Sequence, residues 1–193
     1  MPFWELTAVF FGILYLVLAM RDTPWCWAAG LISTAILAVL FFTAHLYMES
    51  ILQLYYVVMA FYGWRQWQYG GNNDQKLEIS TWNSMQHLIT LISILILSIA
   101  SSLLLARYTD ANYPLLDSII TWGSLITTYM VTRKVLENWL YWIALDALAI
   151  YCYLNKALYL TAGLYLFYVT LAIFGFIHWA AKKKASQHYA FNF

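Results

Sequence analysis

The chain contains two related stretches, LYMESILQLYYVVMAFYGWRQW over residues 46–67 and LYLTAGLYLFYVTLAIFGFIHW over residues 158–179. Their numbers differ by a constant 112 (158 minus 46), and the same offset aligns Trp27 with Trp139. Within the two stretches, the identical pairs are Leu46/Leu158, Tyr47/Tyr159, Leu52/Leu164, Leu54/Leu166, Tyr56/Tyr168, Val57/Val169, Ala60/Ala172, Gly63/Gly175 and Trp67/Trp179. Internal duplication of apolar segments is typical of membrane transporters, whose substrate sites tend to lie between the repeats.

The composition indicates a membrane protein. Hydrophobic residues make up 63% of the 193 residues and charged residues only 10%, whereas a soluble domain carries about 25% charged residues. A bilayer core requires about 20 apolar residues per spanning helix, and open strand edges would leave backbone groups unpaired in lipid. The apolar runs lie at 3–20, 25–44, 48–68, 84–106, 114–132, 138–154 and 158–181. The predicted fold class is therefore an all-α polytopic membrane protein with seven transmembrane helices.

The basic residues predict the orientation in the membrane. The connections that follow the odd-numbered segments, together with the C-terminal tail, carry Arg21, Arg65, Lys76, Arg133, Lys134, Lys182, Lys183 and Lys184. The opposite side carries Arg107 and Lys156. Because positive charges concentrate on the cytoplasmic side, we expect the C-terminus in the cytoplasm and the N-terminus outside.

The duplication predicts two repeats of three helices each. It pairs the third segment with the seventh and the second with the sixth. By extension the first pairs with the fifth, since Arg21 and Arg133 follow them at the same offset. Three helices reverse the side of the membrane, and a fourth helix restores it, so the two repeats become parallel. The predicted domains are 1–69 (first repeat), 70–112 (polar loop and linker helix), 113–181 (second repeat) and 182–193 (cytoplasmic tail).

Polar and aromatic residues on three segments predict a ligand cavity. Polar groups inside a membrane cost free energy and usually face a cavity or each other. The sixth segment carries Asn138, Trp142 and Asp146 at spacings of four, along one helix face. Further candidates follow at spacings of three to four on the third segment, which carries Glu49, Gln53 and Tyr56, and on the seventh, which carries Tyr165 and Tyr168.

Structural interpretations of these residues remain open at this point. Asp146 either faces a cationic substrate or is a buried acid bonded to hydroxyl or backbone groups. Gln53 could form an interhelical hydrogen bond, and Asn138 could cap the start of a helix. An interfacial aromatic belt is the expected role of most tryptophans near segment ends, which are Trp4, Trp25, Trp64, Trp67, Trp82 and Trp179.

Enzymatic and metal-binding functions find no support in the sequence. The histidines His45, His87, His178 and His188 lack metal-ligand spacing, and neither a Walker A loop nor a dinucleotide-binding glycine pattern occurs. The run Lys182–Lys184 fits a lipid-headgroup anchor better than a nucleic-acid patch. We therefore expect no catalytic residue, no cofactor, no metal and no nucleic-acid partner.

An aromatic wall with one carboxylate suits a flat, positively charged ring, because aromatic faces attract cations by about 2 kcal/mol or more when desolvated. A proton relay would show several ionisable groups within the spans. Their scarcity here favours facilitated diffusion over proton coupling.

Three stretches resemble the Pnu family of bacterial vitamin transporters: PWCWAAGLIS at 24–33, YYVVMAFYGWRQW at 55–67 and NWLYWIALDALAIYCYLNKALYLTAGLYLFYVTLAIFGFIHW at 138–179. The resemblance implies a three-one-three fold, similar to a SWEET transporter doubled in one chain, in a monomer or trimer. It also implies uptake across the bacterial inner membrane by facilitated diffusion, with a cytoplasmic kinase that traps the vitamin. The family's site would fall at the run Asn138–Trp142 and the polar-aromatic stripe of the third segment.

The resemblance leaves two main substrates, thiamine and nicotinamide riboside, which are both flat aromatic cations with hydroxyl groups. The riboside demands more amide partners than Gln53 and Asn138 supply, whereas Asp146 or Glu49 could accept a hydrogen bond from the aminopyrimidine of thiamine. Thiamine is therefore the first expectation and nicotinamide riboside the alternative, ahead of riboflavin-like ligands. A non-transporting receptor or ligand-binding subunit is the alternative from another functional class.

Overall fold

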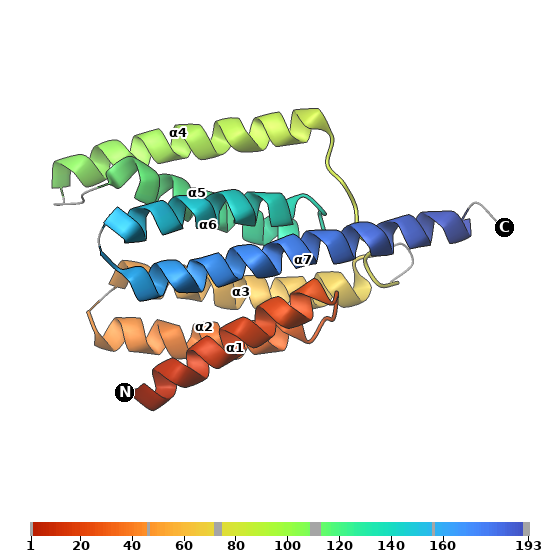
Figure 1. The fold of residues 1–193 in the computed structure, drawn as a ribbon, viewed down its shortest axis with the longest axis horizontal. Helices are drawn as coiled ribbons and strands as arrows, with labels where there is room; N and C mark the ends of the chain where they lie inside the picture. The colour runs from red at the N-terminus through yellow and green to blue at the C-terminus, as the bar shows by residue number, and fades with distance from the viewer. Residues whose placement is uncertain (1, 46, 72–74, 109–112, 156, 191–193) are drawn as a thin grey trace. The chain divides into compact units, whose positions relative to one another are not determined.

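A computed structural model describes the chain except for residues 1, 46, 72–74, 109–112, 156 and 191–193. The described residues form seven α-helices (Figure 1). They are α1 (Pro2–Met20), α2 (Cys26–Thr43), α3 (Tyr47–Tyr69), α4 (Ser84–Tyr108), α5 (Pro114–Thr132), α6 (Asn138–Asn155) and α7 (Tyr159–Ala190). Their ends agree with the predicted segments to within two residues, except at the end of α7. The all-helical prediction is confirmed.

Four of the described helices, α1, α2, α4 and α7, are long and apolar enough to cross a bilayer. On α4, large apolar side chains such as Leu88, Ile96 and Leu103 are exposed, as expected of a surface that contacts lipid. Polar residues lower the mean hydropathy of α3. That α3, α5 and α6 also cross the membrane stays a prediction.

The last helix extends further than the apolar run that predicts it. Helix α7 ends at Ala190, nine residues beyond the predicted end at residue 181. Neither glycine nor proline occurs between Phe176 and Ala190, and alanine and lysine favour helices. Lysines near a helix C-terminus also complement its dipole. Most of the predicted tail is therefore helical.

The chain divides into two compact units. The first unit comprises Met1–Ile79, Val131–Lys134 and Ile177–Phe193, and the second comprises Ser80–Met130 and Val135–Phe176. In the first unit, α1 packs against α2 and α2 against α3. In the second unit, α5 packs closely against α6, because a Cβ atom on Gly123 would lie 2.4 Å from the Leu145 side chain.

Each unit contains the same tryptophan–glycine contact. In the first, a Cβ atom added to Gly63 would lie 2.4 Å from the Trp27 ring. In the second, a Cβ atom on Gly175 would lie 2.7 Å from the Trp139 ring. The two contacts are related by the offset of 112 residues seen in the sequence. Only glycine lets the indole lie this close to the helix backbone.

The ends of α1 and α5 have the same backbone conformation. Asp22 (φ 54°) and Lys134 (φ 49°) are left-handed and lie 112 residues apart. The amide of Thr23 donates to the Leu18 carbonyl at 3.0 Å, and the amide of Val135 donates to the Met130 carbonyl at 3.0 Å. These bonds, with those from the Asp22 and Lys134 amides to Ala19 and Val131, form a Schellman motif at each helix end. The left-handed position is usually glycine, because other residues pay about 1–2 kcal/mol there.

Two tryptophans occupy the centre of the first unit. Trp67 and Trp179 are fully buried, and their ring centroids lie 5.7 Å apart. The Trp67 indole N–H donates to the Val131 carbonyl at 3.0 Å, and the Trp179 indole N–H donates to the Ala19 carbonyl at 3.0 Å. The interpretation of these two tryptophans as belt residues is wrong. Their indoles instead donate to the carbonyls of Val131 and Ala19 in the last turns of α5 and α1, which also accept the amides of Lys134 and Asp22.

Candidate functional site

The predicted site residues of α6 lie in the second unit and differ in burial. Asn138 is fully buried and Asp146 is 6% exposed, while Trp142 is half-buried. The Asn138 side-chain amide donates to the Val135 carbonyl at 2.6 Å. Asn138 therefore ties its side chain back to the preceding turn, whereas an N-cap would accept a bond from the helix.

Asp146 lies near a group of tyrosines in the second unit. The Tyr165 ring on α7 lies 5.1 Å from the ring of Tyr153 on α6 and 5.6 Å from that of Tyr168, centroid to centroid. The Asp146 carboxylate lies within electrostatic range of Tyr165 and Tyr168. The structure thus brings together three predicted residues and adds Tyr153, which the sequence analysis missed although it lies on α6 seven residues after Asp146.

The predicted residues of α3 lie in the first unit. Tyr56 is half-buried, contacts Tyr55 with ring centroids 5.5 Å apart, and lies within electrostatic range of Tyr15. Gln53 is half-buried as well, whereas Glu49 is exposed in the first turn of the helix. A carboxylate in that turn is favoured by the helix dipole alone, so the position of Glu49 has a sufficient structural explanation.

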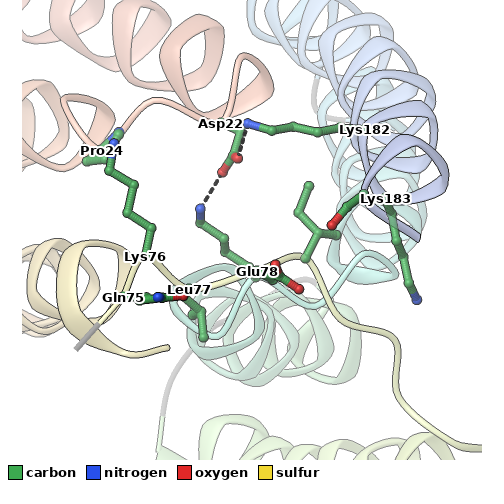
Figure 2. Close-up of a pocket in the computed structure, with 11 residues that line it drawn as sticks. Asp22, Pro24, Gln75, Lys76, Leu77, Glu78, Lys182 and Lys183 are labelled. Atoms are coloured by element: carbon green, nitrogen blue, oxygen red, sulfur yellow. Dashed lines mark hydrogen bonds and ion pairs between the residues drawn. The ribbon is translucent and has the colours of Figure 1, made fainter. Parts of the chain in front are cut away.

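Sequence reasoning missed a polar centre in the first unit that is built around Asp22. Its carboxylate oxygens lie 2.7 Å from the Lys134 Nζ and 2.6 Å from the Lys182 Nζ (Figure 2). The side chains of Asp22 and Lys134 are each 5% exposed, and the Lys134 Nζ lies 4.6 Å from the centroid of the Trp67 ring. The signal for this centre was present in the sequence, because Asp22 and Lys134 directly follow the repeated pair of arginines.

Burial governs the electrostatics of this ion pair. It lowers the pKa of the Lys134 ammonium from its ordinary value, and the Asp22 carboxylate acts in the opposite direction. Lys182 adds a like-charge repulsion that again disfavours the ammonium form of Lys134. One carboxylate is therefore shared between two ammonium groups.

The described residues contain no cluster of three or more histidine, cysteine or acidic side chains that could hold a metal ion. Cys26 and Cys152 are both buried, and neither is part of a disulfide. The polar chemistry of the described part of the chain thus consists of the Asp146–tyrosine group in one unit and the Asp22–lysine group in the other, besides scattered hydrogen bonds.

Comparisons with known proteins identify the family. The family model described as Nicotinamide mononucleotide transporter matches residues 2–181. The chain is similar to the nicotinamide riboside transporter PnuC of Escherichia coli (strain K12), with 21% identity over 91% of this chain and 85% of that protein. It is also similar to the riboflavin/roseoflavin transporter RibM of Streptomyces davaonensis, with 25% identity over 87% of this chain and 80% of that protein.

A solved structure shares the fold. The crystal structure of the vitamin B3 transporter PnuC matches with a TM-score of 0.74 and 21% identity, over 95% of this chain and 83% of that chain. Because the family model covers nearly the whole chain, the chain belongs to the nicotinamide mononucleotide transporter family, the Pnu family of membrane transporters that its sequence resembles.

Proposed function

We propose that this chain takes up a B-type vitamin by facilitated diffusion, and that nicotinamide riboside is its substrate. The observation that carries the proposal is the match of the family model together with the relative PnuC. These comparisons favour the riboside, the alternative from the sequence, over thiamine, the first expectation. The exposed position of Glu49 also weakens the argument for thiamine, which counted Glu49 as a possible acceptor.

The Asp146–tyrosine group is the proposed recognition site for the pyridinium ring. A carboxylate beside aromatic rings attracts a flat cation through charge and through the ring faces. Trp142, four residues before Asp146 on the same helix face, adds an aromatic surface. Asn138, two turns before Asp146 on α6, is the proposed partner for the carboxamide. A role of Gln53, Tyr56 and Glu49 in vitamin binding stays a prediction from the sequence.

The proposed architecture is a pair of parallel three-helix repeats joined by α4, as in SWEET-like transporters. Two observations support it: the tryptophan–glycine contact occurs once in each unit, and α1 and α5 end in the same Schellman motif. Two similar halves allow alternating access around a substrate without an ion gradient. We place the N-terminus outside and the C-terminus in the cytoplasm of a bacterium, where a kinase would trap the vitamin.

Titration of the purified protein with nicotinamide riboside, thiamine and riboflavin tests the substrate. Riboflavin is included because the relative RibM is a riboflavin/roseoflavin transporter. We expect the riboside to bind at least tenfold more tightly than the other two. Preferential binding of thiamine would support the first expectation from the sequence. Preferential binding of riboflavin would indicate that the chain shares the substrate of the relative RibM.

Counterflow in liposomes tests transport separately from binding. Liposomes loaded with unlabelled riboside should accumulate labelled riboside without any ion gradient. Binding without counterflow would instead favour the receptor alternative. A strict requirement for a proton or sodium gradient would contradict facilitated diffusion.

A further inference from the structure

The first unit contains a cavity of about 480 Å³ beside Asp22. It is lined by the turn after α1, the chain after α3, the turn after α5 and the C-terminal part of α7 (Figure 2). Its volume is within the range of small-molecule sites, roughly 300–1,000 Å³. All of its lining residues belong to the same unit. They lie outside the apolar spans of α1, α2 and α4, and Lys182, Lys183 and Ser186 fall in the last five residues of the span Tyr159–Ser186 of α7.

The lining of this cavity is basic. Four lysines, Lys76, Lys134, Lys182 and Lys183, and two acids, Asp22 and Glu78, are among the lining residues, so their net charge is +2. Both oxygens of the Asp22 carboxylate are already paired, one with Lys134 and one with Lys182. The two ammonium groups repel each other across this single carboxylate. A second anion beside Lys182, whose side chain is 53% exposed, would offset this excess positive charge, since charge-assisted hydrogen bonds to ammonium groups are among the strongest in proteins.

The charged groups at the back of the cavity are held in place. Lys134 is only 4% exposed as a residue, and it points at Asp22 from a left-handed backbone position. Asp22 occupies the equivalent position of the other Schellman motif. Non-glycine residues in this conformation persist where the surroundings require their side chains, and they cluster at functional sites.

Helix α7 contributes one face to the cavity. Lys182, Lys183 and Ser186 line it, while Lys184 does not, because Lys184 projects about 200° around the helix from Lys182. Figure 2 shows Lys182 reaching across to Asp22, with Lys183 pointing away from that carboxylate. The Ser186 hydroxyl adds a neutral donor.

We propose that this cavity binds a phosphate-bearing anion, in which the phosphate contacts Lys182 and Lys76 and the remainder of the molecule fills the cavity. Two sources supply this chemistry: a soluble phosphate monoester, such as a nucleoside monophosphate, and the headgroup of an anionic lipid. Basic cavities at a membrane surface suit both. The proposal concerns a site other than the vitamin site and does not depend on which vitamin is carried.

The test measures the thermal stability of the full chain in neutral detergent with adenosine monophosphate, against potassium chloride at equal ionic strength. A second arm compares nanodiscs of phosphatidylcholine alone with nanodiscs containing phosphatidic acid. The variants are Lys76→Gln and Lys182→Gln, with Lys184→Gln as the matched control because it removes the same charge outside the cavity. Titration with the vitamin shows that each variant is folded.

We expect a phosphate-dependent rise in Tm in the wild type and in Lys184→Gln. In Lys76→Gln and Lys182→Gln we expect about tenfold weaker binding, since a hydrogen bond to a charged group is worth about 1.5 kcal/mol or more. A response to adenosine monophosphate identifies a soluble ester as a ligand, and a response to phosphatidic acid alone identifies the headgroup. No response beyond that to chloride in either arm, or an equal loss in Lys184→Gln, would overturn the proposal.

Discussion

Asp22 and Lys134 form a buried ion pair, with 2.7 Å between Oδ1 and Nζ, and they occupy equivalent positions 112 residues apart in a duplicated sequence. Each residue terminates a helix in the left-handed conformation, Asp22 after α1 and Lys134 after α5. Duplication first places the same residue at both positions. Because the two positions now carry opposite charges, the two helix ends attract each other. The ion pair joins the turn after α1 to the turn after α5 within the first unit.

Single substitutions of this pair should be strongly destabilising. Removal of one partner from a buried pair leaves an uncompensated charge and costs about 3–5 kcal/mol. We expect Lys134→Gln to lose stability in this range. Asp22→Asn should lose at least as much, because it leaves both Lys134 and Lys182 without their carboxylate. Thermal unfolding of the detergent-solubilised protein measures both effects.

The charge-swapped double variant Asp22→Lys/Lys134→Asp is the control for this prediction. It should recover part of the stability lost in the single variants, because both positions share the same backbone conformation. Lys182→Gln should cost less than 1 kcal/mol, since the Lys182 side chain is 53% exposed and exposed pairs contribute little. If the double variant loses as much stability as Asp22→Lys and Lys134→Asp lose together, the importance of the pair is contradicted.

Alanine at the two repeated glycines should destabilise both units. The added Cβ atom would lie 2.4 Å from the Trp27 ring in Gly63→Ala and 2.7 Å from the Trp139 ring in Gly175→Ala. Overpacking of this kind costs about 1–3 kcal/mol, and the cost should lower Tm by a similar amount in the two variants.

Gly163→Ala is the matched control, because nothing lies within 4 Å of the Cβ position at Gly163. Alanine is favoured over glycine in a helix by about 1 kcal/mol, so this variant should be neutral or more stable. A loss of stability at Gly163 equal to that at Gly63 would show that the two tryptophan contacts are not the cause.

The helices were predictable because their signals are local. Long apolar runs located every helix to within two residues except the end of α7, where lysine and alanine continue the helix beyond the apolar run. The burial of Trp179 was not predictable from its position near a segment end. It depends on the carbonyl of Ala19, a residue 160 positions away in the chain. Contacts at this distance carry no mark in a single sequence.

Some of the polar groups were likewise predictable from the sequence, and others were not. The spacings predicted one polar stripe with Asp146 on the sixth segment and another with Tyr165 and Tyr168 on the seventh. In the structure the Asp146 carboxylate lies within electrostatic range of both tyrosines. Asp22 escaped notice because its sequence signal, the position directly after the repeated Arg21, does not indicate that it pairs with Lys134. Residue types led to thiamine as the first expectation, although an acid beside aromatic rings fits either vitamin. The similarity to the relative PnuC is what favours the proposal of nicotinamide riboside.

Trp142→Ala should weaken vitamin binding far more than Trp4→Ala. Trp142 is half-buried on the helix face that carries Asp146, whereas Trp4 is 55% exposed at the start of α1. A desolvated contact between a cation and an aromatic ring is worth about 2 kcal/mol, which corresponds to roughly a thirtyfold loss of affinity. Isothermal titration with nicotinamide riboside measures it, and equal losses in the two variants would refute the assignment of the site to this part of α6.

Asp146→Asn separates recognition of charge from a structural role. The substitution keeps the size of the side chain and removes its negative charge. If Asp146 faces a cationic ring, the affinity for nicotinamide riboside and for thiamine should fall by about tenfold or more, since loss of a charged partner costs about 1.5–3 kcal/mol. Binding of uncharged riboflavin, where detectable, should change little. Tm should stay within a few degrees of the wild type. A fall in Tm with unchanged affinity of the folded fraction would instead make Asp146 a structural acid held by the tyrosines around it, and recognition of the cation would then rest on the aromatic rings alone.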